Sequence, residues 1–342
     1  MVRCFLIGAG ASKACSIDGI AEMPTAPDFM KKIRAKFPYF ANLVKLYGTS
    51  KGLTEVALST DNTWLEKKIF LEDFDFEGFI SYCLDETQHA ENSRFVYQFS
   101  RILWNLIVEP SRQILQNQTL YDILLEDKSF EDKEKENFFI NLNYDILLDN
   151  AIWSKRKNNY YEDNRKKVQY FIDYGFLFKI PNFEVNNDGI LSCYKIHGSY
   201  NWAESKGSKQ IIANNDYYSP EKFGRTIIPP RKIKSLELND LLLPIYNIAE
   251  ERMKTVDELI VIGCNLLNED KHIKKLIKVF NDSNKSKFVK IVYFEDNGQK
   301  QQDYEMKIKS LFTDKIIVIF YSGGFNDDSI NRFIFKPWED IK

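Results

Sequence analysis

The chain has 342 residues, which suffices for one large domain or for two smaller ones. Its formal net charge of −2 argues against a protein that binds nucleic acid directly by neutralising phosphates. No apolar run reaches the roughly 20 residues that span a bilayer, and the N-terminal residues lack the order of a signal peptide, so we expect a cytoplasmic protein that binds no membrane.

The first predicted strand leads directly into a glycine-rich turn. MVRCFLI is mainly apolar, and it is followed by five small residues: Gly8, Ala9, Gly10, Ala11 and Ser12. Glycines allow a sharp turn and a close approach to a ligand, so that backbone N–H groups can face phosphate oxygens. The dinucleotide fingerprint G-x-G-x-x-G has a third glycine where this chain has Lys13. Two interpretations therefore stay open for the turn alone: a phosphate site, or a turn that binds nothing.

The segment after this turn has mostly helical spacing. Between residues 28 and 125, apolar side chains recur three and four positions apart, which predicts a helical insertion. We expect a single domain whose core is formed by residues 1–27 and 138–342. The segment 126–137 is highly charged, with Phe130 as its only apolar side chain, and predicts a surface loop.

Strands and helices alternate over the rest of the chain. Short apolar runs predict strands at 138–143, 194–199, 259–263, 287–296 and 315–324, and helical spacing predicts helices at 144–153 and 241–258. Polar stretches at 154–168 and 203–218 predict surface insertions. The alternation predicts an α/β fold with a Rossmann-like, doubly wound and mostly parallel sheet, whose ligands bind at the carboxyl ends of the strands.

Small or polar residues stand at the ends of four predicted strands. They form the glycine-rich turn, Asn143-Tyr144-Asp145, His197-Gly198-Ser199 and Gly263-Cys264-Asn265. Each also has a structural alternative. His197 could be a hydrogen-bonded structural group, Asn143 could begin a helix, and Asp145 could be a favourable charge at a helix N-terminus.

The cysteines and histidines do not form a metal-binding pattern. The five cysteines are scattered without a C-x-x-C pair, and the three histidines are widely separated. This distribution predicts neither a zinc site nor a disulfide framework, and it fits a reducing compartment.

Five short motifs, taken in order, resemble those of the bacterial sirtuin-like NAD-consuming proteins. They are GAGAS, INLNYDILLDNA, KIHGS with the following NW, IIPP at 227–230, and IVIGCNLLNED. The resemblance is to the branch associated with antiphage defence rather than to the protein deacylases. Deacylases carry a zinc ribbon with two cysteine pairs, which this sequence lacks.

The resemblance implies a role for each matching residue. The turn at residues 8–12 would hold the NAD pyrophosphate, and Asp28 would belong to the cofactor loop, although Met30 replaces the usual arginine of that loop. Asn143 would position the nicotinamide ribose and a water, with Asp145 as its companion acid and His197 as the general base. The adenosine half would lie on the turn of Gly263, Cys264 and Asn265, and either Glu295 or Asp296 could accept hydrogen bonds from ribose hydroxyls.

The activity that the resemblance implies is metal-free hydrolysis of NAD+ to nicotinamide and ADP-ribose, which depletes cellular NAD in antiphage (abortive infection) defence. The helical insertion at 28–125 would cover the NAD cleft. No sensor domain is recognisable in the sequence, so we expect control through a homo-oligomer or through a partner such as a HerA-type ATPase or an Argonaute-like protein. Two alternatives stay open: a catalytically silent module that binds NAD or ADP-ribose, and an NAD-dependent deacylase.

Overall fold

The computed structural model describes residues 1–25, 104–131, 135–160, 172–175, 191–204, 211–213, 226–228, 239–267, 271–282 and 287–341. Asp28 and residues 28–103 of the predicted insertion lie outside these ranges, as do most residues of the polar stretches predicted at 154–168 and 203–218. The predictions made for those residues stay predictions.

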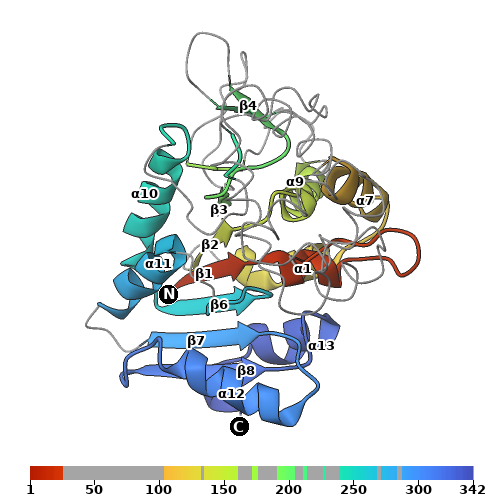
Figure 1. The fold of residues 1–342 in the computed structure, drawn as a ribbon. Helices are drawn as coiled ribbons and strands as arrows, with labels where there is room; N and C mark the ends of the chain where they lie inside the picture. Colours follow the sequence, from red (N-terminus) through yellow and green to blue (C-terminus); the bar gives the residue numbers. More distant parts are fainter. Residues whose placement is uncertain are drawn as a thin grey trace, which may run out of the picture.

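Within the described residues, six parallel strands form one sheet in the order β3-β2-β1-β6-β7-β8 (Figure 1). Their bounds are β1 Val2–Ile7, β2 Glu136–Asn141, β3 Ser192–Tyr194, β6 Glu258–Ile262, β7 Lys287–Val292 and β8 Ile316–Tyr321. Successive connections lead outward from β1 on one side and outward from β6 on the other, which is the strand order of dinucleotide-binding domains. The α/β Rossmann-like prediction is confirmed.

The central strands are continuous apolar runs because both faces of the sheet are covered. Five of the six residues of β1 are buried, and every residue of β6 is buried. The right-handed rule for crossovers between parallel strands assigns the helix that follows β2 to one face and the helices that follow β6 and β7 to the other. These helices are α9 Leu147–Tyr160, α11 Lys271–Asn281 and α12 Gly298–Lys309.

The other described elements are shorter or lie beside the sheet. The helices are α1 Ala9–Ala14, α7 Glu109–Ile114, α8 Leu120–Leu125, α10 Leu243–Met253 and α13 Asp327–Ser329. Trp104–Val108 and Ile330–Ile334 are π-helices, and Lys128–Phe130 and Trp338–Asp340 are 3₁₀-helices. β4 Trp202–Glu204 and β5 Ile211–Ala213 pair as a small antiparallel sheet.

The charged segment 126–137 differs from the predicted surface loop. Phe130 is buried, and its ring lies 5.4 Å from that of Phe5, 5.8 Å from that of Phe139 and 5.9 Å from that of Phe335. The strand predicted at 138–143 already begins at Glu136. One aromatic side chain therefore anchors an otherwise polar connection to the core, and charge content alone does not reveal this contact.

The strand predicted at 194–199 is also different. β3 ends at Tyr194, and residues 195–199 form a buried irregular segment. The Gly198 N–H donates to Lys195 O at 2.9 Å and closes a turn, in which Gly198 has φ +85°. His197 therefore lies beyond the strand rather than at its last position.

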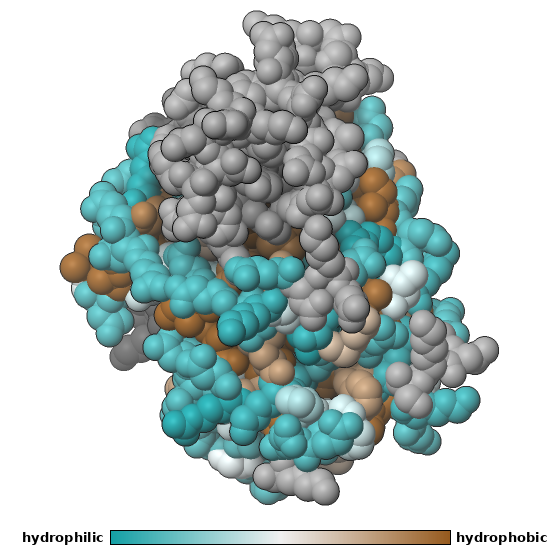
Figure 2. Space-filling model, turned by 180° about the vertical axis from the view of Figure 1, so that it is seen from behind, coloured by the Kyte–Doolittle hydropathy of each residue, from teal (hydrophilic) through white to brown (hydrophobic). Residues whose placement is uncertain are grey.

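The described surface is mainly polar on the face seen in Figure 2. Figure 2 shows hydrophilic residues over most of the described area of one face, with smaller apolar areas between them. None of the helices in the described ranges combines the length and the apolar character that a membrane crossing requires.

Candidate functional site

Four neighbouring strands bring the predicted motifs to one edge of the sheet. β3, β2, β1 and β6 are adjacent and parallel, so the residues that follow them lie along the same carboxyl edge. The sheet reverses its winding between β1 and β6, and ligands of open α/β sheets bind at such a reversal. The fold thus assembles the motifs at the edge where open α/β sheets bind their ligands.

The glycine-rich turn packs against the turn after β6. The Gly8 N–H donates to Ile262 O at 2.9 Å, and the Gly10 N–H donates to Gly263 O at 2.9 Å. A Cβ on Gly8 would lie 2.5 Å from Gly263 O, and a Cβ on Gly263, whose φ is +60°, would lie 2.1 Å from the Ala11 nitrogen. Contact between two backbone turns therefore requires these glycines.

This packing reduces the number of backbone N–H groups in the turn that can bind a phosphate. The N–H groups of Gly8 and Gly10 donate to the β6 side, and that of Ala11 donates to Gly8 O at 3.0 Å. Three of the N–H groups expected to face oxyanions thus bond within the protein. Ala9 is the exposed residue of the turn, while Ser12 is buried at its end.

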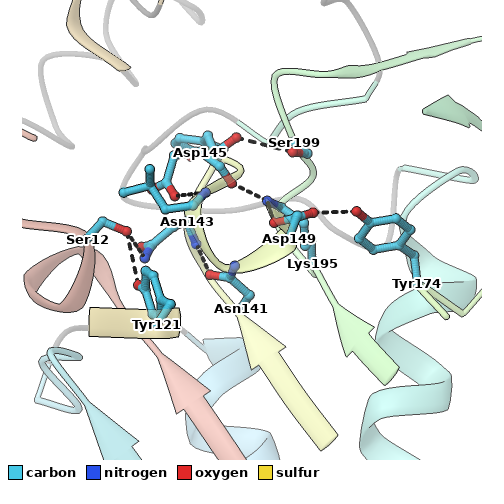
Figure 3. A network of polar contacts seen from close by, with 11 residues as sticks. Ser12, Tyr121, Asn141, Asn143, Asp145, Asp149, Tyr174, Lys195 and Ser199 are labelled. Atoms are coloured by element: carbon cyan, nitrogen blue, oxygen red, sulfur yellow. Dashed lines mark hydrogen bonds and ion pairs between the residues drawn. The ribbon is translucent and has the colours of Figure 1, made fainter. Parts of the chain in front are cut away.

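A buried polar cluster connects the ends of β1 and β2 (Figure 3). Asn143 Nδ2 donates to Gly8 O at 3.0 Å and to Ser12 Oγ at 2.9 Å. The Ser12 hydroxyl also lies 3.2 Å from the hydroxyl of Tyr121, which comes from α8. The backbone N–H of Asn143 donates to Asn141 Oδ1 at 3.0 Å. Asn143 is therefore held at both its backbone and its side chain.

Asp145 faces the protein rather than solvent. It is 3% exposed, and its Oδ1 accepts from the Leu147 N–H at 3.0 Å. Burial raises the pKa of Asp145 above its ordinary value, although the charge of Lys195 and hydrogen bonds from Ser12 and Leu147 oppose this shift. Its carboxyl group fixes the loop that follows β2.

A buried ion pair lies directly behind this loop. The fully buried Lys195 ammonium donates to the backbone carbonyl of Asp145 and, at 2.9 Å, to Asp149 Oδ2. The Tyr174 hydroxyl donates to the other carboxylate oxygen of Asp149 at 2.5 Å. Figure 3 shows these three side chains side by side. The segment after β3 is thereby tied to the loop after β2 and to α9.

The backbone around His197 is held by two neighbouring segments. The Tyr200 N–H and the Ser199 hydroxyl both donate to Tyr144 O, at 3.0 and 3.2 Å. The Ile228 N–H donates to His197 O at 2.9 Å. The structure therefore brings His197 to the same edge as Asn143 and Asp145, and it leaves the His197 side chain 5% exposed.

The residues predicted for the adenosine half lie on the other side of β1. Cys264 is buried, and Asn265 is exposed and accepts from the Leu267 N–H at 3.1 Å. Glu295 follows β7, is half-buried and accepts from the Asn297 N–H at 3.0 Å. Asp28 lies outside the described residues, so its predicted role is untested.

Sequence reasoning missed three of the polar side chains at this edge: Tyr121, Lys195 and Asp149. The one visible signal was a lysine inside the apolar run YKIHGS. Tyr121 lies within a Thr119-x-x-Asp122 capping box, which predicts a helix start but not the direction in which the tyrosine side chain points. Among the described residues, no group of three or more histidine, cysteine or acidic side chains is placed to hold a metal ion.

The fold and this edge define the chain as a Rossmann-like α/β protein with a buried polar cluster at its switch point. No protein-family model and no curated protein sequence matches the chain.

Proposed function

We propose that the protein is an NAD+ glycohydrolase that cleaves NAD+ to nicotinamide and ADP-ribose. The observation that carries the proposal is the fixed amide of Asn143. Both hydrogens of its Nδ2 are committed, to Gly8 O and to Ser12 Oγ, so the orientation of the amide is set. Its Oδ1 is then the atom available to accept from a ribose hydroxyl or from a water.

The reaction needs few groups. The bond between the nicotinamide nitrogen and the ribose C1′ breaks, and nicotinamide leaves as a neutral molecule with the electron pair. Water adds its hydroxyl to C1′, and its remaining proton passes to a base. His197 would accept this proton, Asn143 would orient the ribose and the water, and Asp145 would hold the loop that carries Asn143.

The remainder of NAD would extend along the carboxyl edge. The pyrophosphate would lie at the turn of residues 8–12, where Ala9 is exposed. The adenosine would lie toward Gly263, Cys264, Asn265 and Glu295.

A silent NAD or ADP-ribose binding module is the second candidate. The burial of His197 favours it, because a general base must reach the water that it deprotonates, and this side chain is 5% exposed. The lack of paired cysteines in the sequence weighs against a zinc-ribbon deacylase.

For the cell, we propose NAD depletion during antiphage (abortive infection) defence, on the basis of the motif resemblance. Such an activity must be restrained before infection. Restraint would be released by assembly of a homo-oligomer or by a partner such as a HerA-type ATPase or an Argonaute-like protein.

The test is a time course of NAD+ loss with purified protein, alone and with such partners, in which nicotinamide and ADP-ribose are quantified. We expect equimolar products, and losses of about 10²-fold or more in His197→Ala and Asn143→Ala. NAD binding by calorimetry without product formation would favour the binding module, and deacylation of an acetylated peptide would favour the deacylase.

A further inference from the structure

Tyr121 reaches the site from an element that the motifs did not include. It is the second residue of α8, whose start is fixed by a capping box between Thr119 and Asp122. Its side chain is fully buried, and its ring lies 5.7 Å from that of Phe325. The cap and the packing together direct its hydroxyl to Ser12, 3.2 Å away.

The hydrogen-bonding capacity of Ser12 accommodates both of its partners. A serine hydroxyl donates once and accepts twice. It accepts from Asn143 Nδ2 at 2.9 Å, which leaves a second lone pair that can accept from the Tyr121 hydroxyl, 3.2 Å away. Burial raises the pKa of Tyr121 well above its ordinary value, so its phenol carries a proton to donate.

We propose that Tyr121 is a positioning residue for the reaction: its hydroxyl holds Ser12, and Ser12 holds the amide of Asn143. The inference rests on the proposed function, since it names the group that orients Asn143 for NAD. Tyr121 touches Ser12 rather than the ligand. Its loss should therefore lower kcat and leave KM nearly unchanged.

The chain offers a matched pair of substitutions. Tyr121→Phe removes only the hydroxyl that contacts Ser12. Tyr246→Phe removes an equally buried hydroxyl on α10 that donates to His272 O at 3.2 Å, outside the site. We expect kcat to fall roughly tenfold in Tyr121→Phe, the effect of losing about one hydrogen bond, with KM for NAD+ within about twofold of wild type. Tyr246→Phe should keep the wild-type kcat.

A double-mutant cycle tests whether Tyr121 acts through Ser12. In a Ser12→Ala protein, the further change Tyr121→Phe should leave kcat unchanged, because the link is already broken. Independent, multiplicative losses in the double variant would overturn the proposal, and so would a wild-type kcat in Tyr121→Phe. If Tyr121→Phe does not fold, a wild-type kcat in Ser12→Ala overturns it equally.

A readout that does not depend on turnover separates this inference from the proposed function. The side-chain amide signals of Asn143 in ¹⁵N-labelled protein, assigned by their loss in Asn143→Ser, report its hydrogen bonds directly. We expect their exchange with solvent to be roughly tenfold faster in Tyr121→Phe and unchanged in Tyr246→Phe. If the wild-type protein fails to cleave NAD+, the proposed function is wrong. The exchange of the Asn143 side-chain amide still shows whether Tyr121 holds that amide through Ser12. Unchanged exchange in Tyr121→Phe overturns this inference.

Discussion

The ammonium of Lys195 and the carboxylate of Asp149 lie 2.9 Å apart, both buried, at the place where the segment after β3 meets α9. Lys195 also donates to the backbone carbonyl of Asp145. One buried cation thus joins the segment that carries His197 to the loop that carries Asn143. The relative placement of the two candidate catalytic residues therefore depends on a pair that touches neither of them.

Replacing Lys195 alone should lower the free energy of unfolding more than replacing both Lys195 and Asp149. Lys195→Met leaves the Asp149 charge buried without its cation, and we expect a loss of about 3–5 kcal/mol in the free energy of unfolding. Lys195→Met combined with Asp149→Asn should lose less, because no unpaired charge remains. Urea unfolding measures both values.

The exposed pair of Lys254 and Glu251 provides the control for this test. Lys254→Met should change the free energy of unfolding by no more than about 0.5 kcal/mol. Equal losses in the single and double Lys195 variants would contradict the role given to the buried pair.

The sequence predicted the sheet better than the connections within it. β6, β7 and β8 are found inside or within one residue of their predicted ranges, because apolar runs in a doubly covered sheet are unambiguous. The burial of Phe130 and the irregular segment after Tyr194 were not predicted. Both depend on contacts with residues distant in the sequence, which local periodicity does not contain.

In the candidate site, too, the positions of the strand ends could be predicted but the long-range contacts could not. The ends of adjacent strands could be placed on one edge from the fold class alone, which put Asn143, after β2, on the same edge as His197, after β3. The partners of those residues could not be predicted. Ser12 and Tyr121 are 109 positions apart in the sequence, and Asp149 and Lys195 are 46 positions apart.

Gly198 should be intolerant of any side chain. Its φ is +85°, and a Cβ would lie 1.8 Å from Thr226 O, so Gly198→Ala combines backbone strain with a clash against another segment. We expect a loss of more than about 2 kcal/mol in the free energy of unfolding, measured in urea.

Gly19 is the matched control for this clash. Its φ is +69°, and a Cβ there would meet no atom within 4 Å, so Gly19→Ala introduces the strain without the contact. The expected loss is about 1–2 kcal/mol. A Gly198→Ala protein as stable as Gly19→Ala would show that the clash is relieved by movement of residues 226–228.

The stability of the protein should reflect the raised pKa of Asp145. An acid whose pKa is higher in the folded than in the unfolded state binds more protons when folded. Its contribution is therefore present at low pH and is lost as pH rises from the unfolded pKa of about 3.8 through the folded pKa.

The comparison of wild type with Asp145→Asn isolates the contribution of Asp145 to the free energy of unfolding. The difference in the free energy of unfolding, wild type minus variant, should decrease as pH rises above about 3.8, because the amide of the variant does not titrate. Urea titrations at several pH values measure it. A difference that grows with pH would mean that Asp145 is stabilised as the carboxylate.

The proposed pyrophosphate position can be tested at Ala9 without disturbing the packed glycines. Gly10 is unsuitable, because a Cβ there would lie 3.0 Å from the Cα of Gly263, and a substitution would perturb the fold as well as any ligand. Ala9 is exposed, so Ala9→Asp places a negative charge at the turn with little effect on packing. We expect NAD affinity to fall about tenfold or more by calorimetry.

Ile20→Asp adds the same charge at a residue that is 70% exposed and lies outside the turn. Its NAD affinity should stay within about twofold of wild type, since water and salt screen a charge on an exposed side chain. Equal affinities for Ala9→Asp and wild type would place the pyrophosphate elsewhere.

Ligand binding should stabilise α8 against local opening through the contact of Tyr121 with Ser12. If NAD or ADP-ribose holds the Asn143 amide, it also holds Ser12 and the phenol bonded to it, so local opening of Leu120–Leu125 becomes less frequent. We expect amide hydrogen exchange in this helix to slow several-fold on addition of ADP-ribose, while α10, Leu243–Met253, is unaffected. Tyr121→Phe should abolish the slowing in α8 without abolishing ligand binding. Slowing that persists in Tyr121→Phe would mean that the ligand reaches α8 by another route, and the hydroxyl contact with Ser12 would not be the link between them.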